Sequence, residues 1–141
     1  MNSSRFKLAP ALVLAAALLA APASAHHSYA MYEQKEIKLQ GTVKELQWTN
    51  PHIFLQVLVP DGKGGNDEWA LEGGGPGQIG RQGWKFNSVK AGEKVTVGVA
   101  PLKDGQKGGA LIVVIKADGS RLNGGPLARL DPDYKPSGDA Q

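Results

Sequence analysis

The stretch that decides the fold is IKLQGTVKELQW, residues 37 to 48. Its odd positions from Ile37 to Val43 are apolar or glycine and alternate with polar residues, as in a half-buried β-strand. After Val43 the apolar residues fall on even-numbered positions, at Leu46 and Trp48. One extra residue near Lys44-Glu45 would cause this change, which is what a β-bulge does. We therefore predict one long bulged strand in which Val43 and Leu46 both point into the core.

The rest of the chain predicts four further strands and one short helix. The strands are expected at residues 52–59, 68–72, 95–99 and 110–116, and the helix at residues 78–82. A long first strand that can bend at Gly41, with a helix between the third and fourth strands, is typical of an OB-type barrel. The predicted fold class is therefore all-β: a five-stranded OB-like barrel with one short helix between strands 3 and 4. An open β-sandwich is the alternative.

Residues 1–25 have the pattern of a secretory signal peptide. Arg5 and Lys7 precede an apolar run from Leu8 to Ala20, and Ala23-Ser24-Ala25 offers the small residues that signal peptidase requires. A membrane anchor is the alternative, but the run is shorter than the roughly 18 to 20 residues of a membrane span. We expect cleavage after Ala25 and a periplasmic mature protein.

Removal of 25 residues from 141 leaves 116, which is enough for one small domain. We predict that residues 26–122 form the OB-like barrel and that residues 123–141, rich in Gly, Pro and Asp, form a flexible C-terminal tail. Because Arg5 and Lys7 leave with the signal, the formal net charge falls from +3 to +1. A nearly neutral domain is a poor candidate for nucleic acid. The chain has no cysteine, hence no disulfide and no thiolate metal site, and no second apolar segment that would span a membrane.

Six motifs run through the mature chain: HHSYAMYEQKEIKLQGTV, LQWTNPH, EWALEGGGP, RQGW, LKDG and GGALIVV. Together they resemble a family of small exported bacterial proteins of unknown function, over residues 26 to 122. The resemblance implies a periplasmic location and an OB-like barrel, but no established activity. The positions that match are His26, His27, Ser28, Trp48, Asn50, Pro51, His52, Glu72, Gly73, Gly74 and Trp84. Gly75 and Gly77 stand where a Ser or Asn helix start is expected, which predicts a weak helix.

The three histidines suggest a metal site. Cleavage after Ala25 would make His26 the first residue, whose α-amine and ring Nδ1 can chelate one metal ion. A third nitrogen, from His52 or alternatively from His27, would complete a T-shaped site that suits Cu(II). The α-amine has a reference pKa of about 7.7 to 8.0, so a metal can displace its proton near neutral pH. Met31 could add a soft ligand for Cu(I).

The distance from the N-terminal arm to His52 decides whether this site can form. His52 follows the Asn50-Pro51 turn at the far end of the first strand, whereas the arm, residues 26 to 35, enters at its near end. Eleven steps from His26 to Ile37 give a reach of at most about 36 to 40 Å. The arm therefore reaches His52 only if it folds back along the barrel; otherwise His27 or a second molecule must supply the third nitrogen.

Two function classes remain. The first is a periplasmic copper-binding carrier or accessory protein, which is predicted to have a protein partner. The second is a metal-free OB-type module that binds a peptide, glycan or protein through a surface of Trp48, Asn50, Glu72 and Trp84. For Glu72 two readings are open: it is a partner of a histidine, or it is either a solvated charge or hydrogen-bonded to the glycine amides. No catalytic motif is recognisable, so an enzyme is the less favoured reading.

Overall fold

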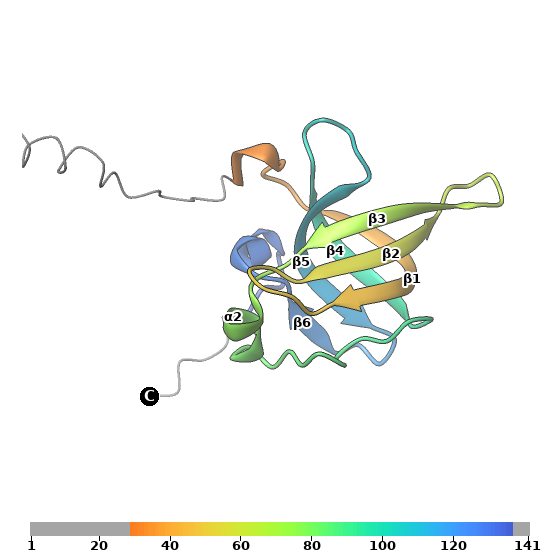
Figure 1. The fold of residues 1–141 in the computed structure, drawn as a ribbon. Helices are drawn as coiled ribbons and strands as arrows, with labels where there is room; N and C mark the ends of the chain where they lie inside the picture. The colour runs from red at the N-terminus through yellow and green to blue at the C-terminus, as the bar shows by residue number, and fades with distance from the viewer. Residues whose placement is uncertain (1–28, 137–141) are drawn as a thin grey trace, which may run out of the picture.

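The computed structural model describes residues 29–136. The signal peptide, His26 and His27 therefore lie outside the described residues. The elements in chain order are the 3₁₀-helix η1 (Tyr29–Met31), the strands β1 (Ile37–Gln47), β2 (Phe54–Pro60) and β3 (Asn66–Glu72), the helix α2 (Pro76–Gly80), the strands β4 (Lys94–Pro101), β5 (Gly108–Lys116) and β6 (Arg121–Asn123), and the 3₁₀-helix η2 (Pro126–Leu130) (Figure 1).

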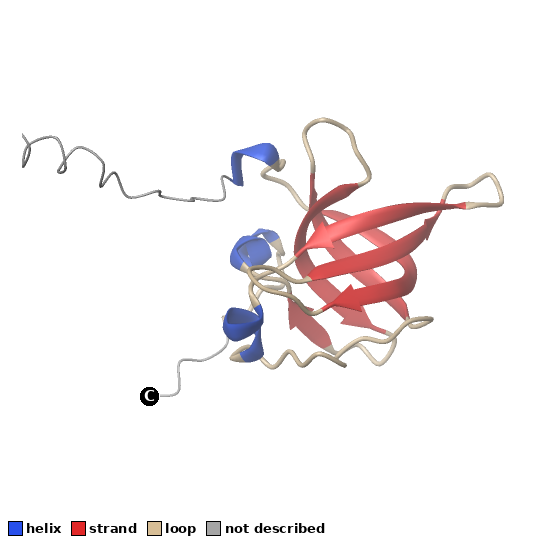
Figure 2. Cartoon of the chain, viewed as in Figure 1, coloured by secondary structure: helices blue, strands red, loops and turns tan. Residues whose placement is uncertain are grey.

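Five of the strands form a closed barrel. β1 pairs with β2 and β4, β2 with β3, and β4 with β5, all antiparallel, and a parallel pairing of β3 with β5 closes the ring. The helix α2 lies between β3 and β4 in the chain. The predicted five-stranded OB-like barrel is therefore confirmed. Figure 2 shows the three helical segments together at one end of the barrel.

The predicted bulge in β1 is also confirmed. The register of β1 against β2 shifts between Val43 and Glu45, so Lys44 is the extra residue. Val43 is buried, and Leu46 packs against the same core cluster, although one position is odd-numbered and the other even-numbered. Gly41 lies where the two strands approach closely, since a Cβ there would come within 2.6 Å of the Leu58 carbonyl oxygen. The register of the backbone is thus the one that the sequence pattern predicts for a long, bent first strand.

The helix is short, as predicted, but it begins two residues earlier than expected. Its N-cap is Gly75, which offers no side-chain hydrogen bond to the first turn. Ile79 and Trp84 are buried, and Gly83 takes a positive φ of 97° between them. Burial of these two side chains therefore holds this segment in place.

A second apolar cluster lies outside the barrel. β5 presents Leu111 to the barrel interior and Ile112 to the other side, which explains why the strand is apolar on both faces. Around Ile112 gather side chains from the N-terminal arm, from β4 and β5, and from η2. They are Tyr32, Ala100, Ala110, Val113 and Leu127. The two ends of the described chain are thus packed on one side of β5.

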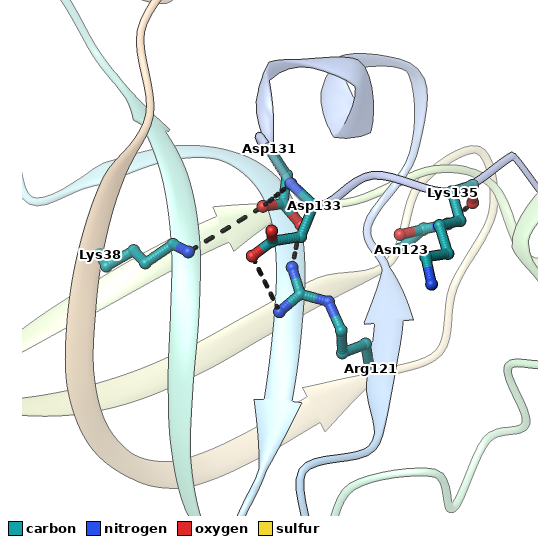
Figure 3. A network of polar contacts seen from close by, with 6 residues as sticks. All are labelled: Lys38, Arg121, Asn123, Asp131, Asp133 and Lys135. Carbon is teal, nitrogen blue, oxygen red and sulfur yellow. Dashed lines mark hydrogen bonds and ion pairs between the residues drawn. The ribbon is translucent and has the colours of Figure 1, made fainter.

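The prediction of a flexible tail from residue 123 is wrong for residues 123–136. Leu127 is only 1% exposed, and Asp131, 3% exposed, forms an ion pair with Arg121 of β6. Lys38 of β1 lies 3.9 Å from the same carboxylate (Figure 3). The buried Leu127 and the ion pairs of Asp131 hold the segment, and neither is evident from the Gly, Pro and Asp composition on which the prediction rested. Residues 137–141 lie outside the described residues.

Candidate functional site

His52 lies at the turn between β1 and β2, where its ring faces the end of β3. The Thr49 hydroxyl donates a hydrogen bond to the His52 carbonyl oxygen (2.9 Å). Ring Nδ1 lies 3.1 Å from the carbonyl oxygen of Gly73 and 3.5 Å from a carboxylate oxygen of Glu72. A carbonyl only accepts, so Nδ1 is the donor, and the lone pair of the neutral ring is on Nε2.

The sequence Glu72-Gly73-Gly74 permits the close approach of the His52 turn to the end of β3. The Gly73 amide donates to the Ile53 carbonyl (2.9 Å) and the Gly74 amide to the Gly124 carbonyl (2.7 Å). A Cβ on Gly73 would lie 2.7 Å from Ile53 Cγ1, so a larger residue would push β3 away from the His52 turn. The glycine amides are thus occupied by carbonyl groups, and the Glu72 carboxylate bonds elsewhere.

The partner of Glu72 is Tyr32, which the sequence analysis did not single out. The Tyr32 hydroxyl donates to a Glu72 carboxylate oxygen at 2.7 Å, and the Tyr32 side chain is only 5% exposed. Burial first, and then the hydrogen bond to Glu72, raises the pKa of this phenol, which therefore remains a donor at neutral pH. Glu72 thus contacts both the N-terminal arm and the ring of His52.

The N-terminal arm is fixed on the barrel near this point. The Glu33 amide donates to the Pro101 carbonyl (2.8 Å), and the Lys103 amide donates to the Met31 carbonyl (3.0 Å). Tyr32 also forms a β-bridge with Leu102. The arm therefore lies along the loop between β4 and β5, and Figure 1 shows η1 at the same end of the barrel as η2.

A small pocket of about 30 Å³ lies between the arm and the barrel. Tyr29, Met31, His52 and Glu72 all line it. The remaining lining residues are Tyr32, Gly73, Ala110, Leu111, Gly124, Pro126 and Leu127. Burial, and then the charge of Glu72, raises the pKa of the Tyr29 phenol. The pocket is far below the roughly 300 to 1,000 Å³ of organic-ligand sites, but it has room for a water molecule or a single ion.

The predicted ligand surface is formed only in part. Trp48 is partly buried and Asn50 is exposed. Trp84 is 2% exposed, and its indole N–H donates to the Asn123 carbonyl (2.7 Å), so this ring offers no surface to a ligand. Trp69 is partly buried against the core cluster, and the Lys107 ammonium lies 5.6 Å from its ring centroid.

An open hollow of about 370 Å³ lies away from these residues. Its lining comes mainly from β1, β4 and the end of β5, and none of the four predicted surface residues contributes to it. The residues around it are Gln40, Gly41, Thr42, Pro60, Asn66, Lys94, Val95, Thr96, Ile115, Lys116 and Ala117. Its volume, unlike that of the pocket beside His52, falls in the range of small-molecule sites.

Of the predicted metal ligands, the structure describes His52 and Met31 and brings them to one pocket. Within residues 29–136, no group of three or more His, Cys, Asp or Glu side chains is arranged to hold a metal ion. His26 and His27, which the copper prediction needs, lie outside the described residues. Among the helices of residues 29–136, none has the length and apolar character needed to cross a membrane.

The fold and the site define a class: a small OB-like barrel whose N-terminal arm is docked against a histidine turn. The chain belongs to a family of unknown function, DUF6152, which matches residues 13–111. The predicted resemblance to a family of unknown function is thereby confirmed. Neither the curated proteins nor the solved structures that were searched gave a match.

Proposed function

We propose that this protein is exported, loses residues 1–25 and binds one copper ion in the periplasm, as a carrier or accessory protein. The α-amine and ring of His26 supply two nitrogens, and His52 supplies the third through Nε2. His27 is the substitute for His52. A nitrogen-only site of this shape favours Cu(II), which prefers tetragonal geometry.

The docking of the N-terminal arm beside His52 is the observation that carries this proposal. Tyr29 and Met31 line the same pocket as His52, and Tyr32 is bonded to Glu72 next to the ring. Three steps of chain separate His26 from Tyr29, which limits their Cα separation to about 10 to 11 Å. This short span supports contact of His26 with His52 in the same molecule.

The surroundings of His52 also suit a metal ligand. A ligating histidine usually donates its other ring N–H to a carbonyl or carboxylate, and the Gly73 carbonyl takes this role for Nδ1. The Glu72 carboxylate, 3.5 Å from Nδ1, lies near the ring nitrogen that does not ligate and helps to orient the imidazole. The pocket of about 30 Å³ has room for an ion and is far below the roughly 300 to 1,000 Å³ of organic-ligand sites.

Native mass spectrometry of protein purified from periplasm tests the proposal. The expected species starts at His26 and carries one copper ion, which a chelator removes. Protein that starts at His26 but never carries copper, even after incubation with Cu(II), would contradict copper binding. A different N-terminus would contradict the amine chelate.

A second candidate is a metal-free OB-type module that binds a small molecule, a peptide or a glycan. The open hollow of about 370 Å³ favours it, because that volume is typical of small-molecule sites. The same mass spectra distinguish the two candidates, since the module would carry an organic ligand and no metal. Substitution of Lys94 and Thr96 at the hollow would then release that ligand, whereas His52→Ala would not.

A further inference from the structure

Met31 has an exposed side chain that also lines the small pocket beside His52. It is the only methionine besides Met1, and its side chain is 54% exposed. Its backbone is nevertheless fixed, since its carbonyl accepts a hydrogen bond from Lys103 (3.0 Å) and the next residue, Tyr32, is buried. Burial of apolar surface therefore does not account for a thioether at this point.

The pocket beside Met31 offers a second soft ligand. Met31 and His52 line the same small volume. The hydrogen bond from Nδ1 to Gly73 puts the ring's lone pair on Nε2. Thioether and imidazole together are ligands that Cu(I) accepts at low coordination number.

The walls of the pocket favour a soft monovalent cation. Leu111, Leu127 and Pro126 form an apolar side, and among residues 29–136 Glu72 is the only carboxylate that lines the pocket. Calcium needs about six to eight oxygen ligands and magnesium about six, so neither fits a lining with a single carboxylate. One carboxylate does offset the charge of a monovalent ion.

We infer that Met31 and His52 form a Cu(I) site in this pocket, which shares His52 with the proposed Cu(II) site but uses the Met31 thioether in place of the His26 nitrogens. The inference rests on the proposed copper function through the shared His52, but it does not need the α-amine. The protein would then retain copper in either oxidation state with different ligands: amine and imidazole for Cu(II), thioether and imidazole for Cu(I).

Competitive titration with a chromophoric Cu(I) chelator, under anaerobic reducing conditions, tests this site in the processed protein. Met31→Leu keeps the size of the side chain and removes the sulfur. We expect it to weaken Cu(I) binding about 10- to 100-fold and to change Cu(II) binding by less than about twofold. X-ray absorption of the Cu(I) form should show a sulfur neighbour that Met31→Leu removes.

Two controls separate this inference from the proposed function. Phe86→Leu changes another exposed apolar side chain, 71% exposed and absent from the pocket lining, and should leave both affinities unchanged. One extra residue before His26 should weaken Cu(II) binding and leave Cu(I) binding unchanged. If that extension changes neither affinity while Met31→Leu still weakens Cu(I) binding, the amine chelate is refuted and the Cu(I) site stands. Equal Cu(I) affinity of wild type and Met31→Leu, or no sulfur neighbour, would overturn the Cu(I) site.

Discussion

Leu127→Ala should destabilise the protein substantially, although the residue lies in a segment whose composition resembles a loose tail. Leu127 is 1% exposed and packs with Ile112 and Tyr32 in the cluster outside the barrel. Truncation of a buried leucine costs about 2 to 5 kcal/mol, of which part is the cavity left behind. Because Leu127 borders the small pocket, water can partly fill the space, and we expect the lower end, about 2 to 3 kcal/mol.

Urea unfolding followed by tryptophan fluorescence measures this loss, with an unchanged m-value as the sign that the same surface is exposed. The matched control is Arg129→Ala in the same short helix, whose exposed side chain makes one hydrogen bond to the Pro126 carbonyl (2.8 Å). It should change stability by less than about 0.5 kcal/mol. A loss below about 0.5 kcal/mol for Leu127→Ala would refute the packing of η2 on the barrel.

Two further predictions concern charged groups around β1 and β6. Asp131→Asn removes the charge that faces Arg121 (Figure 3). Because Arg121 stays partly exposed, the free energy of unfolding should fall by about 1 to 3 kcal/mol, measured by urea unfolding at pH 7. An unchanged unfolding midpoint would show that the ion pair contributes nothing to stability. Burial raises the pKa of Glu36, so the folded state holds this proton more tightly than the unfolded state, and the residue's contribution to stability falls as pH rises past about 4.3. Glu36→Gln should therefore be more stable than wild type at pH 7 by less than about 1 kcal/mol, and the difference should vanish below about pH 4. A stability difference that grows on acidification would contradict the predicted direction of the pKa shift.

The barrel could be predicted because its decisive features are periodic. A strand has a side-chain period of two, so a single inserted residue at Lys44 changes the parity of every later apolar position. The strand β5 is apolar on both faces because a second apolar cluster packs on its outer side. The covering residues, Tyr32 and Leu127, could not be identified, because single apolar residues in irregular segments have no period.

The site could be predicted only in part, for a related reason. His52 follows a recognisable turn, and its place at the end of β1 could be read from the sequence. Its surroundings depend on the pairing of β3 with β5, which brings Glu72 to Tyr32 across a sequence separation of 40 residues. No local pattern encodes such a pairing, so the docking of the arm beside His52 had to come from the structure.

The copper proposal is tested most directly by titrating Cu(II) into two forms of the protein at one fixed pH, because amine and imidazole protons compete with the metal. One form starts at His26, and the other carries one extra residue before it, which removes the chelating amine and keeps all three imidazoles. We predict one tightly bound Cu(II) in the first form and binding weaker by several orders of magnitude in the second. His52→Ala should cost less, about 10- to 100-fold, since water can replace one of three nitrogens. Equal affinity of the two forms would contradict the chelate, and the histidines would then be an ordinary polar start to an OB-type module.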